Sequence, residues 1–259
     1  MAGQYPQRRK PLLWRVPHQQ PVGADDNTVY IGRQTQENAN ANEVRRTIVE
    51  VINHESYDDS TNDNDIALLK MASTVTFTNY IRPVCLAAPG STFHAGTDSW
   101  VTGWGRIVSL PSPQNLMEVE VPVVGNRKCK CDYAGVFLIN DNMICAGLEA
   151  GGKDSWRLWG PMVNKQNSRW IQSGVVSFGR GCARPNNPGV YARVSRYQSW
   201  INSKITENQP GFITFTSSGT DSDLSASCSL VTIMQYVLVI IAQEDTVKNT
   251  APECVLTFV

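Results

Sequence analysis

The side chains that could take part in acid–base catalysis are one aspartate, Asp65, and the three histidines of the chain. Asp65 stands between an Asn/Asp-rich turn and the apolar run at residues 66–69. A buried aspartate can hold a histidine in the tautomer that Ser-His-Asp catalysis needs, whereas an aspartate in a polar turn is an ordinary surface acid. The histidines, His18, His54 and His94, lie in loop-like contexts without a surrounding motif. Both interpretations of Asp65 are open at this point.

The seven cysteines are the second informative set, and their number is odd. Cys129 and Cys131 form a C-x-C pair, but no second Cys or His pair follows at the spacing of a zinc site. A disulfide framework is therefore favoured, and it implies an oxidising compartment. At least one cysteine must lack a partner within the chain; the remaining members are Cys85, Cys145, Cys182, Cys228 and Cys254.

The charge of the 259-residue chain is balanced, with 23 Lys and Arg against 23 Asp and Glu. This balance argues against nucleic-acid binding, which needs a basic face. The polar N-terminus carries no visible signal peptide. The best apolar run, residues 230–242, is shorter than the roughly 20 residues that span a membrane, so no transmembrane helix is expected.

Short β-rich runs separated by Gly, Pro, Asn and Asp begin near residue 29 and predict an all-β sandwich or barrel. One helix is expected after Ser195, which can cap a segment with Tyr197, Trp200 and Ile201 on one face. The expected strands are residues 47–52, 66–69, 99–104, 117–124, 170–178 and 189–194.

Composition divides the chain into four segments. Residues 1–28 are expected to be an irregular leader, and residues 29–208 the folded domain. Residues 209–229 are rich in Ser, Thr and Gly and are expected to be a linker. Residues 230–259 form a tail of uncertain order.

Several ordered motifs between residues 29 and 205 resemble those of the trypsin-like serine proteases, in particular prostasin- or tryptase-like members that are secreted or membrane-associated. Each motif alone is weakly specific, and the resemblance comes from their order. They are 64–69 (N-D-I-A-L-L), 81–86 (I-R-P-V-C-L), 100–105 (W-V-T-G-W-G), 141–147 (D-N-M-I-C-A-G), 151–155 (G-G-K-D-S), 177–183 (S-F-G-R-G-C-A) and 188–191 (P-G-V-Y).

The resemblance implies an all-β fold of two antiparallel Greek-key barrels with a C-terminal helix, in which the first barrel is incomplete because the domain is truncated at its N-terminal side. It implies that Asp65 is the catalytic aspartate and that Asp154 is the pocket acid that binds substrate Arg or Lys. The implied ligands are protein or peptide substrates or protease inhibitors, without a cofactor or metal. The other implied substrate-binding residues are Ser155, Ser177, Phe178, Gly179, Gly181 and Gly189.

Two catalytic segments of the family have no counterpart in this chain. The T-A-A-H-C-like segment with the catalytic histidine is absent, and none of the histidines is expected to replace it. The family run K-D-S-C-Q-G-D-S-G-G-P is interrupted, because residues 156–159 (W-R-L-W) stand where C-Q-G-D-S-G is expected. The change removes the nucleophilic serine and a glycine of the oxyanion hole, and Ser155 is expected to line the pocket rather than replace the nucleophile.

The resemblance also implies a cysteine arrangement. Cys131 and Cys145 are expected to form a disulfide. Cys182 is expected to be unpaired because Trp156 replaces its partner, and Cys85 has no obvious partner.

Ser99 and Asn164 stand where many family members carry another bridged pair. Because both partners differ together, this change leaves no unpaired thiol and is expected to be a tolerated variation. The change at Trp156 has the opposite character, since it leaves Cys182 alone.

Three functions are compatible with these features. The family activity is secreted, extracellular endopeptidase cleavage after Arg or Lys. The chain as written lacks the histidine and the serine, so the favoured interpretation is an inactive, incomplete or variant form of such an enzyme. The alternative is a pseudoprotease that acts as a protein-binding module.

Overall fold

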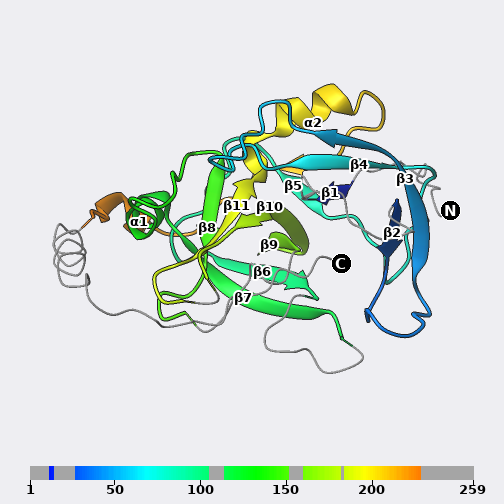
Figure 1. The fold of residues 1–259 in the computed structure, drawn as a ribbon, viewed down its shortest axis with the longest axis horizontal. Helices are drawn as coiled ribbons and strands as arrows, with labels where there is room; N and C mark the ends of the chain where they lie inside the picture. Colours follow the sequence, from blue (N-terminus) through cyan, green and yellow to red (C-terminus); the bar gives the residue numbers. More distant parts are fainter. Residues whose placement is uncertain (1–11, 15–26, 105–113, 152–159, 182–183, 229–259) are drawn as a thin grey trace, which may run out of the picture.

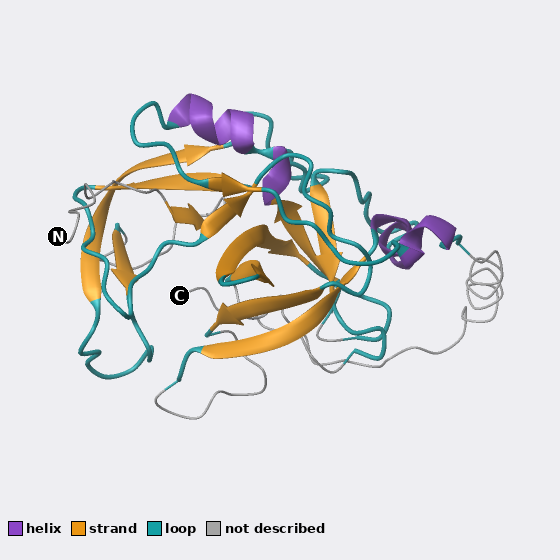
Figure 2. Cartoon of the chain, turned by 180° about the vertical axis from the view of Figure 1, so that it is seen from behind, coloured by secondary structure: helices purple, strands orange, loops and turns teal. Residues whose placement is uncertain are grey.

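The computed structural model describes residues 12–14, 27–104, 114–151, 160–181 and 184–228. These residues form two β-sheets with short helices at their margins (Figures 1 and 2). Among them, no helix is both long and apolar enough to cross a membrane.

The N-terminal half of the described structure is a four-stranded sheet of order β1-β4-β3-β2. All of its pairs are antiparallel. In the described residues, which leave out residues 15–26, this sheet does not close, and the incompleteness of the first barrel stays a prediction. Its first strand lies inside the expected irregular leader, and that expectation is wrong for these residues because their backbone pairs with β4. The strands are β1 (Leu12–Trp14), β2 (Thr28–Ile31), β3 (Val44–Asn53) and β4 (Ala67–Met71).

The C-terminal half is a closed antiparallel barrel of six strands, in the order β11-β8-β7-β6-β9-β10, with β10 returning to β11. The closure leaves none of these six strands with a free edge, which protects the barrel from pairing with another chain. This barrel confirms the predicted fold class. Its strands are β6 (Asp98–Gly103), β7 (Met117–Val124), β8 (Met143–Ala146), β9 (Pro161–Gln166), β10 (Arg169–Phe178) and β11 (Gly189–Arg193).

Two short strands extend the barrel sheet beyond β10. The strand β5 (Cys85–Ala87) pairs in parallel with β10, and β12 (Phe212–Ile213) pairs in parallel with β5. The linker expected at residues 209–229 is therefore wrong, because this segment adds a strand to the sheet and buries Phe215 to 6% exposure. The composition predicted a linker because the segment has few apolar residues, but those few, Phe212, Ile213 and Phe215, attach it to the sheet.

The helices are short and lie at the margins of the sheets. They are α1 (Asn126–Asp132), η1 (Val194–Arg196), α2 (Gln198–Lys204) and η2 (Ser222–Ser225). The expected helix is present as α2, but Ser195 does not cap it. Ser195 is buried within the preceding 3-10 turn, and Tyr197 stands at the helix start without a capping side-chain bond.

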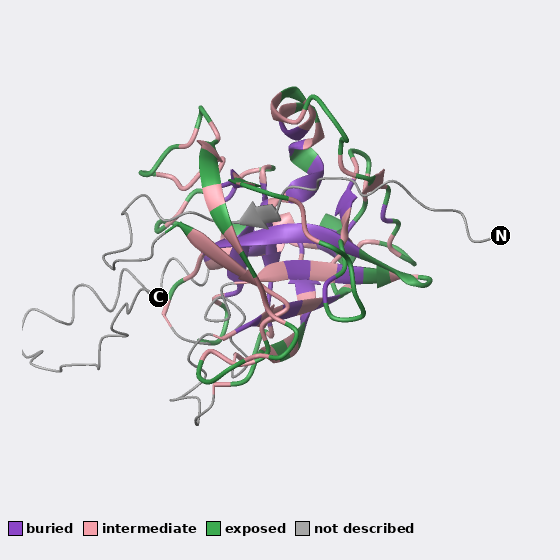
Figure 3. Cartoon of the chain, turned by 90° about the vertical axis from the view of Figure 1, so that its right-hand side faces the viewer, coloured by how far each residue is buried: buried purple, intermediate pink, exposed green. Residues whose placement is uncertain are grey.

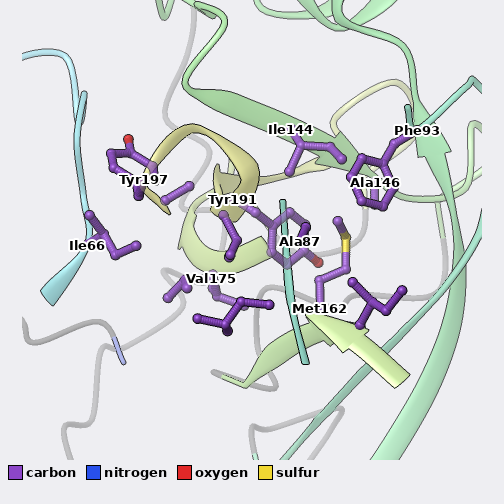
Figure 4. Packing of buried hydrophobic residues seen from close by; sticks show 14 of the residues in the cluster. Ile66, Ala87, Phe93, Ile144, Ala146, Met162, Val175, Tyr191 and Tyr197 are labelled. Atoms are coloured by element: carbon purple, nitrogen blue, oxygen red, sulfur yellow. The ribbon is translucent and has the colours of Figure 1, made fainter. Parts of the chain in front are cut away.

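The larger of two apolar clusters lies between the two sheets (Figure 4), and the buried positions are coloured along the chain in Figure 3. Ile66, the residue before β4, enters it from the side of the N-terminal sheet, while Met162 and Val175 enter from the barrel. Tyr197, beside α2, packs in the same cluster. The core therefore holds the two sheets against each other and fixes the residues at their junction.

The disulfides differ from the expected pairing of Cys131 with Cys145. Cys145 is bonded to Cys129, and Cys131 is bonded to Cys228. The reason is helical geometry, because residues two apart on a helix do not share a face. Cys129 is fully buried and forms its disulfide with Cys145 in β8. Cys131 forms its disulfide with Cys228 near the C-terminal end of the described residues. Among the described cysteines, Cys85 is free.

Candidate active site

Asp65 lies at the junction of the two sheets, immediately before β4. The chain reaches it through a turn in which Asn62 and Asn64 both have φ of 55°, a left-handed conformation that asparagine tolerates. Asp65 is 6% exposed, and its Oδ2 accepts a hydrogen bond of 2.7 Å from the Ser177 hydroxyl. The structure thus brings together two predicted site residues that are 112 positions apart, and it excludes the surface-acid interpretation of Asp65.

The two residues before Asp65 have separate hydrogen-bond partners. Asp63 accepts a hydrogen bond of 3.0 Å from the Asn142 side chain. The Tyr197 hydroxyl lies 3.4 Å from the Asn64 amide oxygen. Burial, followed by the negative charges of Asp63 and Asp65, raises the pKa of Tyr197 well above its usual range. Tyr197 therefore stays a neutral hydrogen-bond donor at the pH of most assays.

Phe178 and Gly179 follow Ser177 along the end of β10, where the pairing with β11 shifts register. The Phe178 ring lies 5.0 Å from the ring of Phe137 and 6.1 Å from that of Tyr133. Sequence reasoning did not select Phe137 and Tyr133, because they lie beyond α1 in a segment without motif or periodicity. They build an aromatic wall beside the predicted substrate-binding strand.

The two predicted pocket glycines lie in different environments. Gly181 has φ of +72°, a left-handed conformation that favours glycine. Gly189 begins β11, is buried, and pairs with Ala146. The roles of both in a pocket remain predictions.

Several predicted features lie outside the described residues. They include the pocket acid Asp154 with its neighbour Ser155, the replaced segment at residues 156–159, and Cys182. His18 also lies outside them.

His54 has a structural environment next to α2. Its backbone N–H donates to the carbonyl of Ile66, and its ring lies 5.5 Å from Tyr197 and 4.9 Å from Trp200. Its Nδ1 accepts a hydrogen bond of 3.2 Å from the N–H of Ser56. These contacts give the ring a packing role.

The packing of His54 predicts a pH dependence of stability. Burial lowers the pKa of His54 below its ordinary value of 6.5. As the pH falls, the imidazole of His54 is therefore protonated in the unfolded chain before it is protonated in the folded protein. The stability that neutral His54 contributes is complete above pH 6.5 and is lost as the pH falls through the lowered folded-state pKa. Urea unfolding between about pH 7.5 and 5 should show a smaller loss of stability in His54→Phe, which keeps the ring packing. Equal slopes in the two proteins would contradict the prediction.

The family model described as trypsin matches residues 19–201, so the match begins earlier than residue 29, where the recognisable motifs were expected to start. The chain is 40% identical over 172 residues to a tryptase of Mus musculus, which covers 62% of this chain and 63% of the relative. It is 42% identical over 152 residues to testisin of Homo sapiens, covering 56% of this chain and 48% of the relative. The chain thus spans less than two thirds of either relative.

Proposed function

Because the chain belongs to the trypsin family, we propose that it is a form of a serine endopeptidase directed to Arg and Lys that has lost hydrolytic activity. The observation that carries the proposal is the replacement of C-Q-G-D-S-G by residues 156–159 between matching flanks. Acyl transfer needs a nucleophile, a base and oxyanion donors, and removal of one oxyanion donor alone costs roughly 10²–10³ in rate.

The position of Asp65 supports descent from a catalytically active serine protease. In the family reaction, the aspartate orients the histidine that takes the proton from the attacking serine. Asp65 is buried and bonded to Ser177, as a fixed orienting group must be. Without the histidine and the serine, this carboxylate has no proton transfer to direct.

The residues that bind the substrate are proposed to remain functional. Asp154 would bind the guanidinium or ammonium group of a substrate, because an opposite charge in a desolvated pocket gives strong selectivity. The end of β10 at Ser177 and Phe178, with Gly179 after it, would align the substrate backbone beside the aromatic wall. The ligands would be peptides, proteins or protease inhibitors.

A pseudoprotease that binds proteins is the second candidate. The closed barrel and its continuous core favour it, because a binding module needs a stable surface. The genomic DNA around the codons of residues 155–160 separates the candidates: a coding segment for C-Q-G-D-S-G would make this chain a variant of an active enzyme. Its absence would favour the pseudoprotease.

The site of action is proposed to be extracellular. Two disulfides are present in the described residues, and such bonds persist in oxidising compartments.

The proposal is tested with two probes. A fluorophosphonate, which labels active serines, should not label the chain in mass spectrometry, and benzamidine, an arginine mimic, should bind in calorimetry. Asp154→Asn should weaken benzamidine roughly 10- to 100-fold, because a charge-assisted bond is lost. Asp141→Asn is the matched control, since its side chain is 76% exposed. Serine labelling would overturn inactivity, and unchanged binding in Asp154→Asn would overturn the pocket.

A further inference from the structure

The segment at residues 211–228, called the strap here, lies beyond the end of the family match at residue 201. It follows α2, runs along β5 and ends beside α1, where η2 and α1 are neighbours in Figures 1 and 2. The strap therefore connects two parts of the domain that are far apart in sequence.

The first half of the strap is bound to the barrel sheet. The N–H of Leu86 donates to the carbonyl of Gly211 at 3.0 Å, and that of Ala88 donates to the carbonyl of Ile213 at 2.9 Å. Phe215 is buried and stacks on Phe93, with ring centroids 4.8 Å apart. Backbone pairing and ring burial together fix the course of this half.

The second half of the strap caps α1 through Asp223. Its Oδ2 accepts from the N–H of Arg127 at 2.8 Å, and its Oδ1 accepts from the N–H of Lys128 at 2.9 Å. These are first-turn donors, which have no partner within a helix. The residue at the cap position is Gly125, which has no side chain to supply an acceptor. A Cβ on Gly125 would lie 2.1 Å from Cγ of Asp223, so glycine makes room for the capping carboxylate.

The other end of α1 leads to the candidate substrate-binding wall. Tyr133, which follows the helix, is fully buried, and its hydroxyl donates to the carbonyl of Pro188 at 2.6 Å. Its ring also lies against Phe137 and Phe178. A shift of α1 would therefore move the aromatic wall and the residue that precedes Gly189.

We propose that Asp223 is a positioning residue for substrate recognition, which it controls by fixing α1 and, through Tyr133, the wall at Phe137 and Phe178. The inference rests on the proposed function for the role of that wall. The carboxylate acts at a distance from any ligand. Its effect is transmitted by the short helix, which the Cys131–Cys228 and Cys129–Cys145 bonds hold at two further points.

The test combines hydrogen–deuterium exchange with binding of the peptide acetyl-Phe-Pro-Arg-amide to the full chain. Asp223→Ala should raise exchange in residues 126–139 and 177–179 and weaken the peptide about three- to tenfold, the range expected for loss of a helix cap. Asp223→Asn, which keeps one acceptor oxygen, should recover part of both effects. Ser217→Ala is the matched control: it removes hydrogen bonds of the strap to His94 and Thr92 but leaves α1 capped.

The outcomes separate this inference from the proposed function. Faster exchange in the wall with Asp223→Ala, but not with Ser217→Ala, supports positioning. Exchange that rises only within the strap, or equally in both variants, overturns it. If the unaltered chain does not bind the peptide, the proposed recognition function fails, while the exchange data still decide whether Asp223 positions the wall.

Discussion

Replacing Cys131 and Cys228 together with alanine is expected to lower the free energy of unfolding by about 4 to 5 kcal/mol. The bond closes a loop across 97 residues, from α1 to the end of the strap, so its removal frees much of the unfolded chain. Domains of this kind are stable by only about 5 to 15 kcal/mol, so the variant should be close to unfolding at ambient temperature. Urea unfolding followed by tryptophan fluorescence measures the change.

The matched control is the double replacement of Cys129 and Cys145 with alanine. That bond spans only 16 residues, for which loop closure predicts about 3 kcal/mol. Both bonds anchor α1, so the comparison separates loop length from loss of the helix contact. A larger loss from the shorter loop would contradict the entropic account and would place the stabilisation in the buried packing of Cys129 instead.

The disulfide pairing could not be predicted correctly from the sequence. The motif around Cys145 correctly indicated a disulfide, but the expected partner, Cys131, was wrong, because Cys129 supplies it. That choice depends on a helix the sequence did not predict, α1, and on which side of it each sulfur lies. The partner of Cys131 also lay in a segment that composition assigned to a linker.

The strap was missed for a related reason. Its stabilising contacts include backbone pairing with β5, one buried ring, one capping carboxylate and the Cys131–Cys228 bond, and none of these has a periodic pattern in sequence. Strands within the barrel were easier to predict, because their apolar residues repeat against polar neighbours. In β7, for instance, Glu118 and Glu120 are exposed and Val121 is fully buried, which confirms the alternation.

The contact between Asp65 and Ser177 was accessible from sequence only through the family resemblance. Both residues were selected separately by motif, and the structure places their side chains in contact. Asp154 and Ser155 were selected by the same reasoning and remain predictions.

The expected tolerance of Ser99 and Asn164 has a physical basis in the barrel core. Both are fully buried, and the Asn164 amide donates to the Ser99 hydroxyl at 2.8 Å and to the carbonyl of Asp98 at 2.7 Å. The Ser173 hydroxyl donates to the Asn164 amide oxygen at 2.5 Å. A polar network thus links neighbouring strands at the position where relatives are expected to carry a disulfide.

Asn164→Ala is expected to destabilise the protein by about 2 to 4 kcal/mol, because it removes several buried hydrogen bonds and leaves their partners without them. The informative control is Ser99→Ala/Asn164→Val/Ser173→Ala, which removes the polar side chains together. Replacing the side-chain partners of a buried network by apolar groups is much less costly than orphaning them, and the carbonyl of Asp98 loses its donor in both variants, so the triple variant should be more stable than Asn164→Ala. Urea midpoints of the two variants test this order. A triple variant less stable than Asn164→Ala would show that packing volume, rather than hydrogen-bond satisfaction, holds these strands together.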